Sequence, residues 1–237
     1  MSGISSRRGD HDSEPSRRRA SIEPRRSGSP VRGNCRISTH WPKSVHVSGH
    51  KFEPRTAISI LLDEIAPDVA EARYELHPQS RLHVPLHITL LFPFVLRRDV
   101  SADLLGELRS FFGNHSRPMF ELTHVATFPD VVAYAAPEPD GALKRLTCEL
   151  WSAYPETPPY GGEFGMSEPV LHATLAPLDV AHVETVRARV EPLLPVRCEP
   201  SHASLLEEFE PDRWRELEAL PFTTLTCRES PTSSPPL

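Results

Sequence analysis

The sequence predicts an α+β fold built from two similar halves, and three observations lead to this prediction. Short apolar runs typical of strands alternate with segments of helical periodicity. The pattern L-H-x-T-L occurs twice, at residues 86–90 and 171–175, so that the two histidines are 85 residues apart. Each copy of the motif lies in its own half of this series of strands and helices. We therefore expect an internally duplicated domain in which a pseudo-twofold axis relates two lobes.

The first half of the domain contains two expected strands and two expected helices. Residues 56–62 are apolar and partly β-branched, which favours a strand. A helix is expected over 67–76, because a proline suits its first position and a second proline follows its end. The first motif strand should span about 86–91. A second helix is expected up to residue 112, with Ser101 as its N-cap and apolar residues at helical spacing.

The middle of the chain predicts a hairpin and a third helix. Residues 120–128 and 131–135 read as strands joined at Pro129-Asp130, a dipeptide typical of turns. An apolar stripe of leucines predicts a helix over 141–154.

The last part of the domain surrounds the second motif. Residues 155–168 are rich in proline and glycine and read as a loop that could shape a site. After the motif we expect a helix over 180–194 and two strands, near 196–207 and 214–220. The last strand is polar enough to be an edge strand.

The two motifs place the same pair of polar side chains on one face of a strand. Side chains at i and i+2 share a face, so His87 and Thr89 should project together while the flanking apolar residues point the other way. The second copy repeats this with His172 and Thr174. A third, looser match at His202-Ala203-Ser204 lacks the leading leucine, and we interpret it as structural. If the axis brings the two motif strands together, both histidines face one cleft.

Two imidazoles and two hydroxyls suit acid–base chemistry at phosphorus. An unperturbed histidine titrates near pH 6.5, so one ring can act as a base while the other acts as an acid. The threonine hydroxyls can donate hydrogen bonds to phosphate oxygens without a metal. The sequence contains no P-loop, no G-x-S-x-G pattern and no histidine or cysteine spacing typical of a zinc site. We therefore expect in-line displacement at phosphorus, with no cofactor and no metal.

Charge is distributed unevenly along the chain. Residues 1–55 carry 12 Lys and Arg against 5 Asp and Glu, a balance of +7, and the remainder carries 14 against 27, a balance of −13. An acidic domain is a poor general binder of long nucleic acids, which are held mainly through cationic contacts to phosphate. An RNA end or a small nucleotide is the expected partner.

Composition also predicts the domain organisation and the compartment. Residues 1–55 are rich in Arg, Ser, Gly and Pro, which predicts a disordered tail, although a transit-peptide-like segment or an upstream translation start would look similar. We expect the domain to span 56–228 and to be followed by a flexible tail over 229–237. The four cysteines are scattered, and we find neither a secretory signal nor a membrane span. These features favour a cytoplasmic monomer that does not contact a membrane.

The paired H-x-T motifs resemble the two-histidine (2H) phosphoesterase superfamily. Within it, P-L-H-I-T-L-L-F-P-F at residues 85–94 is similar to the bacterial 2'-5' RNA ligase family. Softer similarities lie at residues 128–132, 135–139 and 158–162, and the resemblance covers about 56–222. One departure is that the segment before the second motif, residues 168–171, lacks the usual proline directly before the apolar-His step.

The resemblance implies a bilobal fold in which two antiparallel-rich sheets flank a central cleft and the helices lie outside. It implies metal-independent action on 2',3'-cyclic or 2'-5' phosphodiesters of RNA ends or small nucleotides, with RNA ligation as the related reaction. His87 and His172 would then be the catalytic pair, and Thr89 and Thr174 would position the phosphate.

Two aromatic residues are further candidates for substrate contact. Tyr160 either stacks on a base or covers an edge of the core, and Phe92 follows the first motif. Two alternative functions stay open: a non-catalytic binder of RNA ends or phosphorylated ligands, and a hydrolase of a non-RNA cyclic phosphate such as an ADP-ribose derivative.

Overall fold

The computed structural model describes residues 52–157 and 169–223. Both predicted tails, apart from the residues next to the domain, and the candidate Tyr160 lie outside the described residues. In chain order the elements are β1 (Thr56–Leu61), α1 (Pro67–Leu76), α2 (Ser80–His83), β2 (His87–Leu91), η1 (Arg97–Asp99), α3 (Ala102–Gly113), β3 (Phe120–Phe128), β4 (Val132–Glu138), α4 (Gly141–Ala153), β5 (Ala173–Pro177), α5 (Val183–Val190), η3 (Glu191–Leu193), β6 (Val196–Cys198), β7 (His202–Glu210) and β8 (Arg213–Pro221).

The described strands form one antiparallel sheet with the order β6-β3-β4-β5-β2-β1-β7-β8. Its two middle strands, β2 and β5, are joined through the single residue pair Ile88 and Ala173. Four strands lie on each side of this junction. The two predicted sheets are therefore the two halves of one sheet, and each half ends at the junction with a motif strand.

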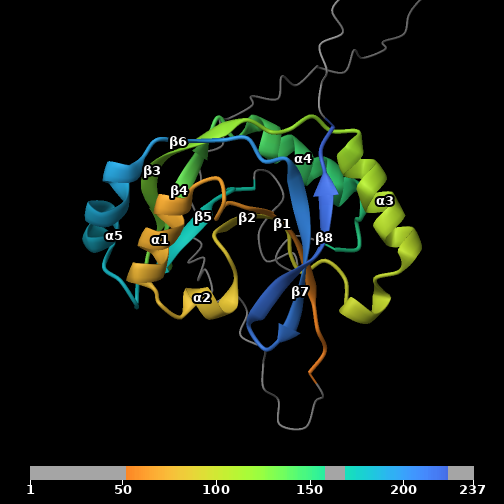
Figure 1. The fold of residues 1–237 in the computed structure, drawn as a ribbon, viewed down its shortest axis with the longest axis horizontal. Coiled ribbons are helices and arrows are strands. Elements are labelled where there is room, and N and C mark those ends of the chain that lie inside the picture. Colours follow the sequence, from red (N-terminus) through yellow and green to blue (C-terminus); the bar gives the residue numbers. More distant parts are fainter. Residues whose placement is uncertain (1–51, 158–168, 224–237) are drawn as a thin grey trace, which may run out of the picture. The chain divides into compact units, whose positions relative to one another are not determined.

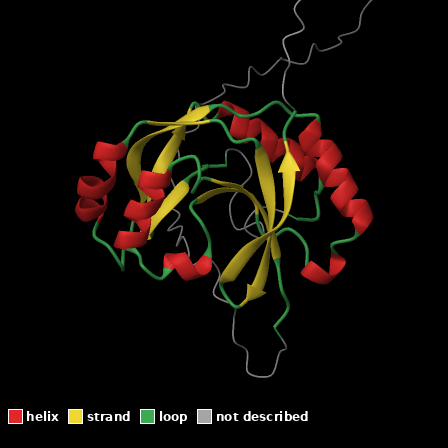
Figure 2. Ribbon diagram, in the orientation of Figure 1, coloured by secondary structure: helices red, strands yellow, loops and turns green. Residues whose placement is uncertain are grey.

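Helices cover each half of the sheet and produce two lobes (Figures 1 and 2). Helices α3 and α4 contact the half that contains β1, β2, β7 and β8, whereas α1 and α5 contact the half that contains β3 to β6. Each lobe holds one motif, which confirms the predicted bilobal α+β class. The lobes are not consecutive in sequence, because α1 and α4 each cross to the lobe opposite the strand that precedes them.

The core lies between the helices and one face of the sheet. Ile58, Ile60 and Ile88 are fully buried there, together with apolar residues of α1, α3, α4 and α5. Since side chains alternate along a strand, the motif histidines and threonines must point to the opposite face. The packing of the apolar positions thus fixes which side of the sheet carries the polar motif residues.

Most predicted elements agree with the structure. Helix α1 has the predicted bounds, and the Ser101 hydroxyl caps α3 by accepting a hydrogen bond from the Leu104 amide at 3.1 Å. Strand β3 has its predicted bounds as well, and β8 is an edge strand as expected. The strand expected over 131–135 continues to Glu138, and the short helix α2 was not predicted.

The structure corrects two predictions in the last part of the domain. The single strand expected near 196–207 is two strands, β6 and β7, which lie in different lobes. Pro200 lies between them and cannot donate a hydrogen bond to a sheet ladder. The helix expected over 180–194 begins at Val183, after His182 as its N-cap, and ends in a 3-10 turn.

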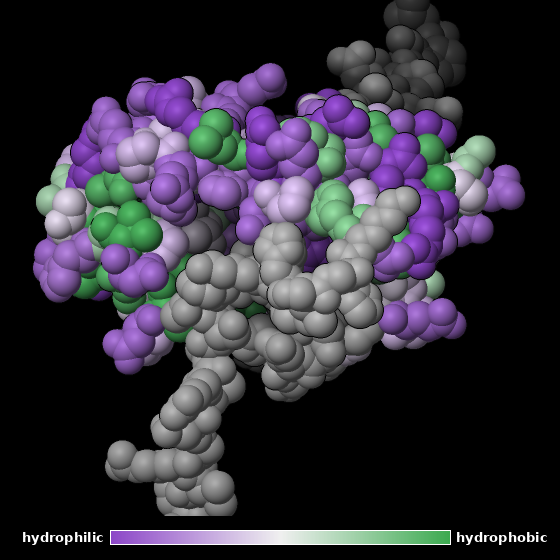
Figure 3. Space-filling view, turned by 90° about the horizontal axis from the view of Figure 1, so that it is seen from below, coloured by the Kyte–Doolittle hydropathy of each residue, from purple (hydrophilic) through white to green (hydrophobic). Residues whose placement is uncertain are grey.

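The visible surface is mainly polar. In the view of Figure 3, hydrophilic residues predominate and hydrophobic ones form small separate areas. The large apolar side chains exposed among the described residues are Leu82, Met119, Val170 and Val180. No helix within 52–157 and 169–223 is long and apolar enough to cross a membrane.

Candidate active site

His87 is the first residue of β2 and is held by the main chain. Its side chain is buried, with 8 % of the residue exposed, and Nδ1 lies 2.8 Å from the carbonyl oxygen of Pro85. A carbonyl oxygen can only accept, so Nδ1 carries the proton and donates it. In the neutral ring the lone pair is therefore on Nε2, which is the nitrogen that can act as a base.

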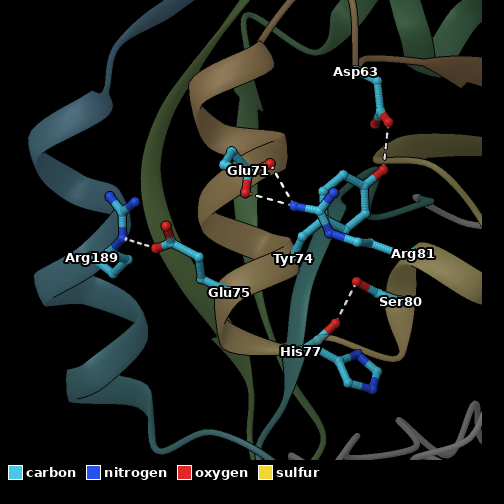
Figure 4. Close-up of polar contacts among 8 residues, drawn as sticks. All are labelled: Asp63, Glu71, Tyr74, Glu75, His77, Ser80, Arg81 and Arg189. Atoms are coloured by element: carbon cyan, nitrogen blue, oxygen red, sulfur yellow. Dashed lines mark hydrogen bonds and ion pairs between the residues drawn. The ribbon is translucent and has the colours of Figure 1, made fainter.

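The segment before His87 is anchored on both sides of Pro85. The Asp63 carboxylate accepts a hydrogen bond from the Leu86 amide at 2.6 Å, and the Arg73 guanidinium donates to the Val84 carbonyl at 2.9 Å. Asp63 also accepts a short hydrogen bond from the Tyr74 hydroxyl (Figure 4). These bonds fix the peptide units on either side of Pro85. They therefore fix the carbonyl that orients the His87 ring.

Ion pairs attach the surrounding helices to one another. Arg81, on α2, contacts the Glu71 carboxylate of α1 at 2.6 Å, and Arg189 of α5 contacts Glu75 at 2.6 Å (Figure 4). These pairs are exposed to solvent, which screens them, so their contribution to stability is small. Their effect is to keep α2 beside α1, close to the anchored segment.

His172 precedes β5 and is held in the same way. Its Nδ1 lies 2.9 Å from the carbonyl oxygen of Val170, so Nδ1 is again the donor and Nε2 carries the lone pair of the neutral ring. Two aromatic rings flank it: the centroid of Phe128 is 5.0 Å away in an edge arrangement, and that of Tyr134 is 5.4 Å away. This aromatic wall, Phe128 and Tyr134, comes from β3 and β4.

The register of the central strands places both motifs on one face. Ile88 pairs with Ala173 across the β2–β5 junction, so the residues on either side of that pair project together from the opposite face. Extending this antiparallel register by one residue sets His87 opposite Thr174 and Thr89 opposite His172. The two histidines are then diagonal neighbours, which lie about 7–8 Å apart in such sheets and somewhat closer at Cβ. Both threonines are half-buried.

Burial favours the neutral form of both histidines. Desolvation lowers the pKa of His87 to about 4, against the opposing hydrogen bond to Pro85, and the nearby charges of Arg73 and His172 lower it further. Desolvation also lowers the pKa of His172. The electrostatic effect of His172 on His87 agrees with the short diagonal that the register gives. An anion between the rings would offset both shifts, because it stabilises the protonated form.

Polar side chains continue from Thr89 across the neighbouring strands of its lobe. Ser59 on β1 is directly opposite Thr89 and also directly opposite Ser204 on β7. The Ser204 hydroxyl donates to the Glu216 carboxylate at 2.8 Å, and the His202 ring lies 3.5 Å from the same carboxylate. The looser motif at His202 and Ser204 thus takes part in a strand-to-strand contact with β8, in line with its structural interpretation.

Comparison with known proteins identifies the family of the domain. A family model described as the 2'-5' RNA ligase superfamily matches residues 61–210, which include both motifs. The chain belongs to this superfamily. The match confirms the family that the paired motifs resemble, and it spans every strand from β2 to β7.

The chain is also similar to solved structures, at low sequence identity. E. coli LigT in complex with 3'-AMP is 20% identical, with a TM-score of 0.47, and the match covers 73% of this chain and 100% of LigT. The protein TT0787 of Thermus thermophilus is 17% identical, with a TM-score of 0.45 and the same coverage. No curated protein matches the sequence.

Phe92, which follows the first motif, is buried in the structure. Phe92 is 1 % exposed and packs in a small apolar cluster with Ala57, Leu206 and Trp214. Its ring meets that of Trp214 edge-on at 5.7 Å, and the Arg55 guanidinium lies 5.2 Å from its centroid. This packing gives Phe92 a structural role, and its contact with substrate stays a prediction. Tyr160 lies outside the described residues.

The aromatic wall beside His172 was not predicted as part of the site. Phe128 and Tyr134 belong to strands that sequence analysis identified, but nothing in a single sequence shows that these strands pair beside the second motif. Strand periodicity was the one available signal. Tyr134 lies between the small buried residues Ala133 and Ala135, so its ring should project from the opposite face of the strand. Within the described residues, no group of three or more His, Cys, Asp or Glu side chains could hold a metal ion.

Proposed function

We propose that this protein hydrolyses 2',3'-cyclic phosphodiesters at RNA ends or on small nucleotides, with His87 and His172 as acid and base and without a metal. The observation that supports the proposal is the matched pair of histidines. Both rings stand on the same face of adjacent strands, and both donate Nδ1–H to a main-chain carbonyl two residues earlier. Each ring then uses Nε2 for proton transfer.

The proposed reaction is an in-line displacement at phosphorus. Nε2 of one neutral histidine accepts a proton from water as the water oxygen forms a bond to phosphorus. The P–O3' bond breaks, and Nε2–H of the other, protonated histidine gives its proton to the departing O3'. The products are a 2'-phosphate and a free 3'-hydroxyl. The arrangement of the rings is compatible with either histidine in either role.

The lowered pKa values fit this scheme once substrate is present. In the empty site both rings are mainly neutral near pH 7, because burial disfavours their charged forms. A cyclic phosphate carries a negative charge, which raises the pKa of a ring beside it and allows one ring to hold the proton of the acid. Thr89 and Thr174 donate their hydroxyls to the non-bridging oxygens, where charge develops.

Ligation is the same displacement with a different nucleophile. If a 5'-hydroxyl replaces water, its oxygen bonds to phosphorus, O3' leaves, and the product is a 2'-5' phosphodiester. No additional residue is needed. The balance between hydrolysis and ligation then depends on whether a 5'-hydroxyl or water occupies the position in line with O3'.

One alternative substrate has an observation in its favour. The chain after residue 55 has a net charge of −13, which suits a small cyclic phosphate better than a long polyanion. A cyclic phosphate of an ADP-ribose derivative satisfies the same chemistry. The second alternative is binding of RNA ends or phosphorylated ligands without turnover.

A substrate panel tests these candidates. The purified full chain is incubated with EDTA and, separately, a cyclic-phosphate oligonucleotide, 2',3'-cyclic mononucleotides and an ADP-ribose cyclic phosphate. Turnover of the nucleotides to 2'-phosphates supports the proposal, and turnover of the ADP-ribose derivative alone supports the first alternative. Binding of these compounds with no product from any of them contradicts an enzymatic role and supports the second.

A further inference from the structure

A pocket of ≈ 450 Å³ lies next to the second motif and has no part in the proposed proton transfers. It begins at Val170 and Leu171, directly before His172, and extends along β4 past Tyr134 and Ala136 to Glu138. His124 and Asp140 complete its polar lining. Its volume lies within the range of about 300–1,000 Å³ that small-molecule sites occupy. Phosphate held by the motifs would therefore stand at the entrance of a second, nucleoside-sized space.

The end of the pocket nearest to His172 is aromatic. Tyr134 lies on the same face of the sheet as Thr174, because the two residues are directly paired between β4 and β5. Its ring is partly buried against Phe128, with centroids 4.8 Å apart. Burial raises the pKa of its hydroxyl, which is a neutral donor near pH 7. A flat aromatic ring beside a phosphate site can stack on a nucleobase, and any of the bases can stack in this way.

The far end of the pocket presents a carboxylate. Glu138 is exposed, and its Oε2 accepts a hydrogen bond from the Thr123 hydroxyl at 3.0 Å. It has no cationic partner among residues 52–157 and 169–223, whereas the neighbouring Asp140 is paired with Lys144 at 2.9 Å. A carboxylate offers about four acceptor positions, so Glu138 can accept further hydrogen bonds. No lysine or arginine is among the described lining residues, and a second phosphate would be repelled.

The separation of the two ends favours a purine. Tyr134 and Glu138 share one face of β4, four residues apart, which is roughly 14 Å along a strand. A purine stacked on the Tyr134 side chain extends farther toward the Glu138 side chain than a pyrimidine does. Among the bases, guanine presents two adjacent N–H donors, N1–H and the N2 amine, that a single carboxylate can accept together.

We propose that this pocket binds the base of the cyclic nucleotide and selects guanine, with Tyr134 stacking on the ring and Glu138 accepting from its N–H edge. The inference rests on the proposed function, since it takes the motif site as the place of the phosphate. It adds a base preference, which the H-x-T motifs themselves do not provide.

The test compares base preference in the full chain and two variants. We measure kcat/KM for guanosine, inosine, adenosine and cytidine 2',3'-cyclic monophosphates with wild type, Glu138→Gln and Glu107→Gln. Glu107 lies on the exposed surface of α3 and serves as the matched control. Wild type should favour guanosine over cytidine by about tenfold or more, because a two-point hydrogen bond gives discrimination of this order. Inosine, which lacks the N2 amine, should fall between them.

Glu138→Gln should lose most of the guanosine preference, because glutamine offers one acceptor in place of two. Glu107→Gln should behave like wild type. Equal kcat/KM for all four bases, or an equal loss for all four in Glu138→Gln, overturns the pocket proposal.

The experiment also separates this proposal from the proposed function. If no cyclic nucleotide is turned over, the hydrolytic function fails, and calorimetric binding of 2'-GMP and 2'-CMP then tests the pocket alone. Tighter binding of 2'-GMP that Glu138→Gln abolishes supports the pocket. Equal binding of the two nucleotides, or binding of neither, overturns it.

Discussion

Each motif histidine has a main-chain carbonyl as the hydrogen-bond partner of its Nδ1. His87 and His172 both donate Nδ1–H to a carbonyl two residues earlier, at 2.8 and 2.9 Å. Many catalytic histidines are oriented by a carboxylate, which also stabilises the protonated ring. A carbonyl orients the ring but carries no full charge. Burial lowers the pKa of both rings, so both are mainly neutral near pH 7.

Removal of either imidazole tests its role directly. We expect His87→Ala and His172→Ala each to lower kcat on a 2',3'-cyclic mononucleotide by about 10²–10⁴-fold, the usual contribution of a positioned acid or base. His182→Ala, at the exposed start of α5, is the control and should retain wild-type turnover. The measurement is steady-state kinetics with EDTA present. Wild-type turnover by His87→Ala would show that the proposed mechanism is wrong.

Burial of His87 predicts a pH-dependent stability. Its pKa is about 4 in the folded protein, below the usual 6.5, so between these values the unfolded chain binds a proton that the folded chain does not. Stability from this group is fully present above pH 6.5 and is lost as pH falls toward 4. The loss amounts to about 3 kcal/mol of the free energy of unfolding.

Denaturant unfolding between pH 7 and pH 4 checks this prediction, with His87→Gln as the comparison. The free energy of unfolding should fall less steeply with decreasing pH in the variant, because glutamine does not titrate. Parallel curves for the two proteins would contradict a buried neutral His87.

At this scale the sequence predicted the four motif residues but not their environment. The shared face of His87 and Thr89 follows from strand periodicity alone. The tautomers, the lowered pKa values and the aromatic wall depend on long-range packing, because Phe128 and Tyr134 reach His172 only after β4 pairs with β5. A single sequence contains no signal for that pairing.

Among the elements, the connection between α2 and β2 most clearly supports the orientation of His87. Asp63, just after β1, binds both the Leu86 amide and the Tyr74 hydroxyl, and burial together with this bond raises the pKa of Tyr74 to about 12. Asp63 thus joins α1 to the first residues of the motif. The carbonyl of Pro85, which orients His87, lies between this anchor and the bond from Arg73 to Val84.

We therefore expect Asp63→Ala to impair catalysis indirectly, by releasing the segment that orients His87. We expect a fall in kcat of about tenfold or more, since a site loses rate when its supporting bonds are removed. The lost hydrogen bonds should lower the free energy of unfolding by about 1–3 kcal/mol. Glu64→Ala, at the exposed adjacent position, is the control and should change neither quantity.

The measurement combines turnover with urea unfolding at a temperature at which both variants are folded. Asp63→Asn, which keeps an acceptor for the Leu86 amide, should recover part of the rate. Full activity in Asp63→Ala would mean that the Pro85 carbonyl does not need this anchor.

Helices and strands were predicted correctly where local sequence signals mark their ends. The predictions failed where the result depends on which distant strands pair. Pro67 and Ser101 mark helix starts because their effects act within one turn. The division of residues 196–207 into β6 and β7 could not be read from apolar content, since both pieces are strands. Only the sheet order shows that they lie in different lobes.

At the scale of the whole molecule, the two halves of the sheet are joined through one strand pair, β2 and β5. A single residue pair joins β2 to β5, and the four motif side chains surround that pair on the opposite face. The lobes were predicted, as was the presence of one motif in each. Their interleaved assembly was not, because α1 and α4 cross between lobes and a sequence repeat does not reveal such crossings.

The net negative charge of the domain predicts that its affinity for RNA depends only weakly on RNA length and on salt concentration. The chain from residue 52 onward carries a net −13, so few phosphates beyond the reacting one should be neutralised on binding. With a protein that begins at residue 52, the slope of log affinity against log salt for a single-stranded 20-mer should be shallower than about −1.4, which corresponds to two phosphate contacts. A slope near −3 or steeper would indicate an extended RNA track.

The central claim is that His87 and His172 face one phosphate, and a titration with inorganic phosphate tests it most directly. The ¹⁵N signals of both imidazoles are followed by NMR as phosphate is added to the full chain. We predict that Nε2 of both rings shifts toward the protonated position with a single, shared dissociation constant. A response from one ring alone, two different constants, or no response from either would contradict a common site.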